Sequence, residues 1–422
     1  MDTTPFHLVL FALDIVTLGG LFLWLRYRHE TESTHLAVYQ YERSLYTHGV
    51  FHYHSYLWDF AGIVIFGSFY FVCFAFLSRL IFTDYIQKHV YNFNVGQCIA
   101  EGIAIHGTLI FAVTTALLCW KRRYLWATFF GVSAIVLAGI CFKALYWEPY
   151  HVKVEYYKIE TAKVKEPVRI VFVADIQTDR IGSHEINTLK KIQHLDADLI
   201  ILGGDYIQTY LGHRGKQLPE RFRQMLLDHP LTAPLGVYAI AGNIRDAGVP
   251  DAELFRETSI EYYQKSTILP DLGADEQMGP IDLVLLGLGH SWGGLGKHGV
   301  TDSGNFIVMA GHCPNYAIDG WTNPKTGNSL SGYRKAGKAP DLMLAGHTHG
   351  GQVVIPYYGP LSMGGDARVN QIPRSMMSGF HKYSNGSYLL VTRGSGMERG
   401  WAPRIRLFCP PEISVIDIVP KE

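Results

Sequence analysis

The stretch Leu342-Met343-Leu344-Ala345-Gly346-His347-Thr348-His349-Gly350-Gly351-Gln352 joins a short apolar run directly to a cluster of histidine and glycine. An apolar run of this length, bounded by glycine, is typical of a buried strand. Similar runs occur at Val168–Ala174, Asp198–Leu202, Gly236–Ala241, Ile281–Leu286 and Phe306–Ala310. Fully apolar strands separated by helices or long loops predict sheets that are covered on both faces.

The last strand-like runs, Ser387–Thr392 and Ile413–Val419, have no helical pattern between them, whereas Ile186–Leu195 reads as a helix between the first two strands. This mixture favours an α/β/β/α sandwich over a single doubly wound sheet. We expect this domain to occupy residues 151–422.

Polar residues follow five of these runs, and each alone would be an ordinary turn or capping residue. Carboxyl ends of α/β strands converge on one crevice, so we expect the five endings to meet. Their carboxylates, amide oxygens and imidazoles, without a thiolate, suit hard or borderline divalent metals. The endings are Asp175-Ile176-Gln177, Gly204-Asp205, Gly242-Asn243, Gly311-His312 and Gly346-His347-Thr348-His349.

The ordered set D-x-Q, GD, GN, H and GHTHGGQ resembles the signature of calcineurin-like metallophosphoesterases, in particular their membrane-anchored branch, over about residues 168–418. The resemblance implies a hydrolase of phosphoesters or diphosphates in which two divalent ions activate water. Mn²⁺ is the first candidate, with Fe, Zn or Mg as alternatives. Carried over residue by residue, Asp175, Gln177 and His349 would hold one ion, Asn243, His312 and His347 the other, and Asp205 would bridge them.

Two positions depart from the common motif. Gln177 stands where many members have histidine, and its carbonyl oxygen can still bind a metal. Ile244 replaces a histidine thought to help the leaving group, and Arg245 is the natural substitute. A guanidinium can hold a phosphate but cannot act as a general acid. This favours a leaving group that needs little protonation, such as the phosphate of a diphosphate. A similar arginine occurs in UDP-2,3-diacylglucosamine pyrophosphatases, which this chain resembles in that residue. Alternatively, Arg245 pairs with Asp246 or another acid and only shapes the loop.

Asp205, Arg245 and His290 are the candidate catalytic residues, and Arg245 is also the candidate for substrate binding. His290 lies on another strand-end loop and could supply the missing imidazole or be structural. Three arginines of the C-terminal segment could contact phosphate or lipid headgroups, although solvated surface residues are the default reading: Arg393, Arg399 and Arg404.

The first 150 residues contain four apolar runs, each long enough for a bilayer core, which takes about 20 residues. Tryptophan and tyrosine near the ends of these runs favour membrane helices over a soluble bundle, and the N-terminus has no basic region typical of a signal peptide. We expect a four-helix transmembrane anchor over residues 1–150, with membrane lipids around it. The runs are Phe6–Leu25, Leu57–Phe82, Cys98–Trp120 and Tyr124–Trp147.

The basic residues of the short loops predict the orientation. Arg26, Arg28 and Arg43 follow the first run, and Lys121–Arg123 follow the third. The positive-inside rule puts these loops in the cytoplasm and the catalytic domain on the extracytoplasmic side. This orientation conflicts with the lipid-A pathway likeness, whose enzymes work on the cytoplasmic side.

Several polar residues of the chain can each be interpreted either as functional or as structural. Asp14 lies inside an apolar run, where a charge is expensive and marks a functional candidate, unless it is protonated or pairs with Glu101 or His106. The histidine-rich segment 29–54 could bind metal, although an interfacial aromatic segment is the preferred reading. Cys313 and Cys409 could pair, which would not define the redox compartment.

The formal net charge of zero argues against a nucleic-acid binder held by phosphate neutralisation. The leading hypothesis is a membrane-anchored phosphoester or diphosphate hydrolase acting on lipid or lipid-linked substrates. A non-catalytic metal or phosphate sensor is disfavoured by the complete ligand set, and a transporter or receptor by the few polar residues in the apolar runs.

Overall fold

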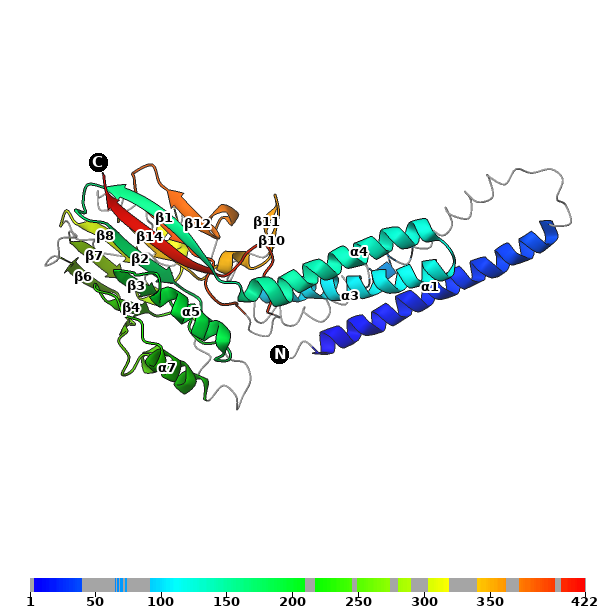
Figure 1. Cartoon of the computed structure of the whole chain (residues 1–422), viewed down its shortest axis with the longest axis horizontal. Helices are drawn as coiled ribbons and strands as arrows, with labels where there is room; N and C mark the ends of the chain where they lie inside the picture. The colour runs from blue at the N-terminus through cyan, green and yellow to red at the C-terminus, as the bar shows by residue number, and fades with distance from the viewer. Residues whose placement is uncertain are drawn as a thin grey trace. The chain divides into compact units, whose positions relative to one another are not determined.

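The chain has 422 residues and forms two compact units, described here separately: one chiefly of Lys143–Glu422, the other of Asp2–His89 and Cys98–Phe142. The computed structural model (Figure 1) describes residues 4–39, 65, 67, 69–70, 73, 92–208, 217–244, 249–273, 280–289, 303–318, 340–361, 372–398 and 404–421.

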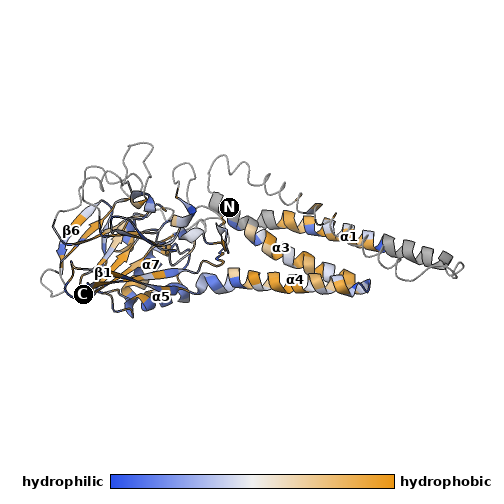
Figure 2. Ribbon diagram, turned by 90° about the horizontal axis from the view of Figure 1, so that it is seen from above, coloured by the Kyte–Doolittle hydropathy of each residue, from blue (hydrophilic) through white to orange (hydrophobic). Residues whose placement is uncertain are grey.

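The N-terminal part contains the helices α1 (Thr4–Tyr39), α3 (Asn92–Trp120) and α4 (Tyr124–Phe142). Three stretches of the described residues are long and apolar enough to cross a membrane: Leu8–Arg26, Ala100–Trp120 and Tyr124–Tyr150. Figure 2 shows the hydrophobic character of α4 over most of its length. The second predicted run lies outside the described residues, apart from a few isolated helical positions.

Inside this helical unit, His106 Nδ1 lies 2.6 Å from Asp14 Oδ2, and both side chains are buried. The pairing considered for Asp14 is therefore present, with His106 as the partner. Helix α1 continues well beyond the predicted end at Leu25, because residues 26–39 contain neither glycine nor proline to stop it.

Helix α4 is followed along the chain by a π-helical turn, η1 (Lys143–Trp147), and a 3₁₀ turn, η2 (Glu148–Tyr150). The second unit contains two six-stranded sheets. The first has the order β1-β14-β2-β3-β4-β5, and only the β14–β2 pairing is antiparallel. Its strands are β1 (Lys153–Thr161), β2 (Val168–Val173), β3 (Leu199–Leu202), β4 (Val237–Ile240), β5 (Glu261–Tyr263) and β14 (Glu412–Pro420).

The second sheet has the order β12-β13-β9-β8-β7-β6, with parallel pairing at its centre and antiparallel strands at both edges. A separate hairpin joins β10 (Val354–Ile355) to β11 (Gly359–Pro360). The strands of the second sheet are β6 (Thr267–Leu272), β7 (Ile281–Leu285), β8 (Phe306–Ala310), β9 (Leu342–Ala345), β12 (Gly379–Lys382) and β13 (Tyr388–Val391).

The two sheets pack face to face through an apolar core that includes Phe172 and Ile201 of the first sheet and Leu283, Val308 and Leu344 of the second. This burial explains why the central strands are apolar at every position. The core therefore confirms the two β layers of the predicted sandwich.

Helices α5 (Ser183–Gln193) and α7 (Leu218–Asp228) cover the outer face of the first sheet, where Leu189 and Phe222 join its apolar cluster. On the second sheet, Tyr316 of the 3₁₀ turn η4 (Pro314–Ala317) joins the outer cluster. Among the described residues that face carries this turn and no α-helix, so the final α layer of the predicted α/β/β/α order is not seen there.

The remaining differences from the predicted elements have local causes. Helix α5 begins at Ser183, earlier than predicted, because Glu185 accepts a hydrogen bond from the Gly182 N–H and caps its first turn. Strand β1 was not predicted, since all but one of its side chains are exposed or only partly buried and the continuous apolar signal is missing. Further short 3₁₀ turns are η3 (Asp251–Leu254), η5 (His349–Gly351) and η6 (Arg374–Met376).

Candidate metal centre

The polar residues predicted to bind metal all follow the carboxyl ends of parallel strands. They come after β2, β3 and β4 in the first sheet and after β8 and β9 in the second, and the structure brings them together. Six of the seven side chains are buried, and Asn243 is partly buried. They are Asp175, Gln177, Asp205, Asn243, His312, His347 and His349.

Asn243, His312 and His347 form one side of the cluster. The amide oxygen Oδ1 of Asn243 lies 2.7 Å from His312 Nε2 and 2.9 Å from His347 Nδ1. The carboxylate oxygen Oδ2 of Asp205 is 3.1 Å from the same His312 nitrogen. These are the residues assigned to one ion, together with the predicted bridging carboxylate.

Asp175, Gln177 and His349 form the other side. His349 Nε2 lies 3.9 Å from Asp175 Oδ1, a separation that leaves room for a cation in contact with both atoms. Gln177 Nε2 donates a hydrogen bond of 3.2 Å to Asp205 Oδ2. Asp205 therefore contacts residues of both predicted ligand groups and lies between them.

The backbone at the cluster adopts a conformation that is unfavourable for residues other than glycine. Five of the seven residues have φ in the left-handed region: Asp175 (54°), Gln177 (36°), Asp205 (56°), His347 (71°) and His349 (49°). Strain of this kind concentrates at functional sites, where the surrounding structure must impose it.

Two glycines allow the strands to approach closely enough to impose this conformation. A Cβ on Gly242 would lie 2.0 Å from Asp205 Oδ1, and one on Gly396 would lie 1.8 Å from Ile176 O. The Gly396 N–H donates to the Asp175 carbonyl at 2.8 Å. An alanine at either position would push a predicted ligand out of place.

Several backbone groups orient the side chains of the cluster. His312 Nδ1 is 2.8 Å from the Gly203 carbonyl, so this nitrogen carries a proton and donates to it, while Nε2 faces the cluster. The Ile244 N–H donates to Asp205 Oδ1 and the His347 N–H donates to Asp175 Oδ2, each at 2.8 Å. Ile244 thus contributes its backbone to the site although its side chain is apolar.

Burial and neighbouring charges shift the acid–base properties of the site. Burial raises the pKa of Asp175 to about 7. Burial would also raise the pKa of Asp205, but His312 and the Ile244 N–H together lower it to about 2. Burial lowers the pKa of His347 to about 3, with His312 as the second cause.

The pKa values of the remaining two imidazoles are shifted in opposite directions. Burial, then the charge of Arg406, holds the pKa of His349 well below its usual value. Burial would lower the pKa of His312 as well, but the charge and hydrogen bond of Asp205 raise it to about 9. His347 and His349 are therefore neutral at physiological pH, the state in which imidazole binds metal.

The donor set fits divalent metal ions. Among the described residues, the buried oxygens Asp175 Oδ1 and Gln177 Oε1 receive no hydrogen bond, which is costly unless a cation contacts them. Ligand atoms of Asp175, Asp205 and His312 lie within 4.8 Å of one another, as a shared metal site requires.

Two site features were not predicted from sequence. Cys313 is fully buried, and its Sγ lies within 4.8 Å of ligand nitrogens of His312 and His347. Its only sequence signal was its position directly after His312. Cys313 and Cys409 are both free thiols, so the pairing considered for them is absent.

The second feature is Arg406, whose side chain is completely buried. Its guanidinium donates to the backbone carbonyls of Arg393 at 2.8 Å, Cys409 at 2.9 Å, Gly396 at 3.0 Å and His349 at 3.5 Å. It ties the segment beside Asp175 to the loop that carries His349. No motif marks it in the sequence.

The structure describes some of the other predicted site residues and not the rest. Arg245 and His290 lie outside the described residues, as does Arg399. Arg393 forms ion pairs with Glu155 at 2.7 Å and Glu412 at 3.1 Å. Arg404 pairs with Asp179.

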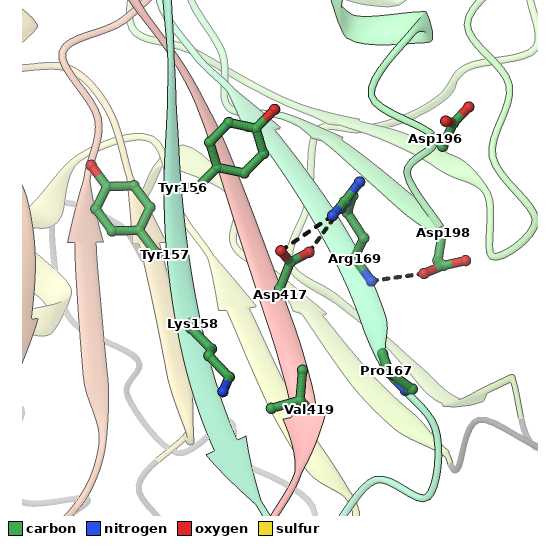
Figure 3. Close-up of a pocket in the computed structure, with 9 residues that line it drawn as sticks. All are labelled: Tyr156, Tyr157, Lys158, Pro167, Arg169, Asp196, Asp198, Asp417 and Val419. Atoms are coloured by element: carbon green, nitrogen blue, oxygen red, sulfur yellow. Dashed lines mark hydrogen bonds and ion pairs between the residues drawn. The ribbon is translucent and has the colours of Figure 1, made fainter.

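A hollow of about 460 Å³ lies at the opposite end of β2, beside Arg169, the second residue of the strand (Figure 3). Its main charges neutralise one another: Arg169 donates to both carboxylate oxygens of Asp417, at 2.8 and 3.3 Å, and its backbone N–H donates to Asp198. The hollow therefore lacks the unsatisfied ligand atoms of the cluster at the other end.

Comparison with known proteins agrees with this geometry. Residues 168–351 match the family model described as calcineurin-like phosphoesterase. An uncharacterized metallophosphoesterase of Aquifex aeolicus (strain VF5) is 24% identical over 288 residues, covering 64% of this chain and 93% of the relative.

Two further relatives extend this similarity. The uncharacterized metallophosphoesterase YkuE of Bacillus subtilis (strain 168) is 26% identical over 314 residues, 71% of this chain and 97% of the relative. Phosphodiesterase YaeI of Escherichia coli (strain K12) is 25% identical over 264 residues, 60% of this chain and 83% of the relative.

Proposed function

Because this chain belongs to the calcineurin-like phosphoesterases and is a metal-dependent phosphoesterase hydrolase, we propose that it cleaves phosphodiesters of lipid or lipid-linked substrates with two metal ions. The phosphodiester is the first candidate because one relative is named a phosphodiesterase. Three helices that are long and apolar enough to cross a membrane support an anchored enzyme close to lipid headgroups.

The observation that carries the proposal is the position of Asp205. Its carboxylate contacts His312 on one side of the cluster and Gln177 on the other, as a carboxylate shared by two ions would. Bound divalent ions would neutralise the phosphate and lower the pKa of a bound water, and Mn²⁺ is the first candidate. The Ile244 N–H fixes Asp205 for this role.

The chain's own groups would divide the remaining work. Asn243, His312 and His347 would hold one ion, and Asp175, Gln177 and His349 the other. The three imidazoles and two amide oxygens would bind without adding negative charge, and the two carboxylates would cancel only two of the four positive charges of two divalent ions, which leaves a net positive charge for an anionic phosphoester. The strained backbone would keep these ligands in place before the substrate arrives.

The direct test is hydrolysis of bis-p-nitrophenyl phosphate by the purified full chain with Mn²⁺. We expect Asp205→Ala to lower turnover by more than about 10³-fold, since metal ions contribute several kcal/mol of charge stabilisation. Asp417→Ala is the matched control, because this aspartate pairs with Arg169 at the other end of the sheet.

Turnover that survives Asp205→Ala would contradict the two-metal assignment. A wild-type chain that binds Mn²⁺ but hydrolyses no phosphoester would instead favour a metal or phosphate sensor. The proposed extracytoplasmic position of the catalytic domain is tested by fusing alkaline phosphatase to the C-terminus, where activity in cells is expected only if that end is outside.

A further inference from the structure

A second hollow of about 530 Å³ lies at the amino end of α5 and is formed entirely by residues of the catalytic unit. We call it the α5 hollow. It is bounded by Tyr150 at the end of η2, by the first turns of α5 and by Arg404 of the C-terminal segment. Its polar lining includes Arg180, Ser183, His184, Asn187, Lys191 and Arg404.

The positive charge of the α5 hollow exceeds the negative charge available to neutralise it. Arg404 pairs with Asp179, but none of the ion pairs among the described residues involves Arg180 or Lys191. The one carboxylate of the lining, Glu185, accepts hydrogen bonds from Thr178 Oγ1 at 2.9 Å and the Gly182 N–H at 2.9 Å. Its oxygens are therefore occupied within the protein.

The hollow also offers donors suited to a tetrahedral oxyanion. The guanidinium of Arg180 can donate to two oxygens of one phosphate, and Lys191 supplies a point charge. Lys191 already donates 3.0 Å to the Val152 carbonyl, which holds its ammonium group beside the hollow. The positive end of the α5 dipole acts in the same direction.

The surroundings of the hollow favour a lipid as the source of that phosphate. Tyr150 is the last residue of the apolar stretch Tyr124–Tyr150. Three aromatic side chains nearby in the same unit are exposed: Tyr146 (70%), Trp147 (53%) and Phe408 (48%). Lys143 Nζ lies 4.0 Å from the Phe408 ring centre, so Phe408 adjoins this apolar end of the helix. Exposed tryptophan and tyrosine at the end of a membrane helix are typical of the headgroup level.

We propose that the α5 hollow binds the phosphate group of an anionic phospholipid, with Arg180 and Lys191 as its principal ligands. The site is distinct from the metal centre and does not depend on the proposed hydrolysis. Gln177 lies three residues before Arg180 in the same loop, so a bound lipid would sit beside the catalytic rim.

The experiment measures binding to the full chain in a nonionic detergent with EDTA present, so that metal ions cannot attract phosphate to the catalytic cluster. The probe is dioctanoyl phosphatidic acid, followed by tryptophan fluorescence. Dioctanoyl phosphatidylcholine and inorganic phosphate are the comparison ligands. We expect phosphatidic acid to bind well below the concentrations at which the other two do.

The double variant Arg180→Gln/Lys191→Gln is expected to weaken phosphatidic acid binding by about tenfold or more, because it removes charge-assisted hydrogen bonds. The matched control is Lys190→Gln/Arg256→Gln, which removes the same charges at exposed positions outside the hollow. The charge-retaining Lys191→Arg should keep the affinity within a few-fold. Thermal unfolding without ligand shows that each variant folds.

Equal losses in both double variants, or no loss in either, would overturn the site. Inorganic phosphate that competes at the affinity of phosphatidic acid would overturn the assignment to a lipid headgroup. Because no metal is present, none of these outcomes depends on whether the chain hydrolyses phosphoesters, and failure of the proposed function would appear only in the turnover assay.

Discussion

Among the described residues, each unit contains a buried Asp–His pair in close contact. In the helical unit, Asp14 and His106 approach to 2.6 Å, and in the catalytic unit Asp205 and His312 approach to 3.1 Å. The first pair joins a carboxylate to an imidazole across two helices, and the Tyr70 hydroxyl is a further hydrogen-bond partner of Asp14. The second is one contact within a cluster of seven polar side chains.

The backbone conformation also distinguishes the two pairs. Asp14 and His106 lie in regular helices, whereas Asp205 has φ of 56° and is held by a neighbouring glycine that tolerates no Cβ. Close pairing within an unstrained backbone stabilises helix packing. Strained residues that bring several carboxylate, amide and imidazole groups together are arranged for a ligand. We infer that the first pair is structural and the second belongs to the site.

The different roles of the two pairs are tested most directly by removing the histidine from each pair. His312→Ala should lower the turnover of bis-p-nitrophenyl phosphate by more than about 10³-fold, since a metal ligand is lost. His106→Ala should leave kcat/KM of the detergent-solubilised chain within about twofold while lowering the unfolding temperature, because the buried Asp14 would lose one of its partners and keep Tyr70. Comparable losses of activity in both variants would assign a catalytic role to the helical pair.

The second prediction concerns pH and metal together. In the metal-free protein burial would lower the pKa of His312, but Asp205 raises it to about 9, against about 6.5 in the unfolded chain. The folded state therefore holds more protons between these values, and its stability falls as pH rises through that window. Asp175, with a pKa of about 7, acts in the same direction at the lower end.

Metal binding should oppose this trend because it requires deprotonated ligands. We expect the unfolding temperature of the EDTA-treated protein to fall from about pH 6.5 to pH 9, by about 2–4 °C for each kcal/mol lost. The increase in unfolding temperature on adding Mn²⁺ should be larger at about pH 8 than at pH 6.5. A metal-free unfolding temperature that is constant over this range would show that Asp205 and His312 are not coupled as described.

The sequence predicted the parts of the fold whose burial is continuous. Strands β2, β8 and β9 are apolar at almost every position because sheets or loops cover both faces, and this pattern is visible without tertiary information. Strand β1 and the short β5 were not predicted, because partly exposed strands share their composition with loops.

The seven predicted ligands could be identified because each follows a strand and their order is specific. Arg406 could not, since its value depends on the carbonyls of His349, Arg393 and Gly396, which only the folded chain brings together. Cys313 carries no comparable signal, because the ligand types that recur at the predicted strand ends are carboxylate, amide and imidazole, and a cysteine occurs there only once.

Arg406 allows the positioning of the predicted metal ligands to be tested within the catalytic unit. Arg406→Lys keeps the charge but loses the planar group that donates to five backbone carbonyls, so we expect Mn²⁺ affinity to fall by about 10–100-fold, as for other residues that orient metal ligands. The control is Arg169→Lys, a partly exposed arginine at the opposite end of β2. Calorimetric titration with Mn²⁺ measures both, and kcat at saturating metal should recover more fully than affinity.

The smallest expected effect belongs to Cys313. Its thiol adjoins His312 and His347, so a thiolate there would favour Zn²⁺ over Mn²⁺ without being needed for either. We expect Cys313→Ser to change the ratio of Zn²⁺ to Mn²⁺ affinity by less than about tenfold, with Mn²⁺-supported turnover retained. Cys409→Ser is the matched control, since this buried thiol contacts the His349 and Gly350 carbonyls and is not among the clustered ligand atoms. An unchanged ratio in both variants would restrict the metal ligands to oxygen and nitrogen, whereas loss of all turnover in Cys313→Ser would make the thiol an eighth member of the cluster.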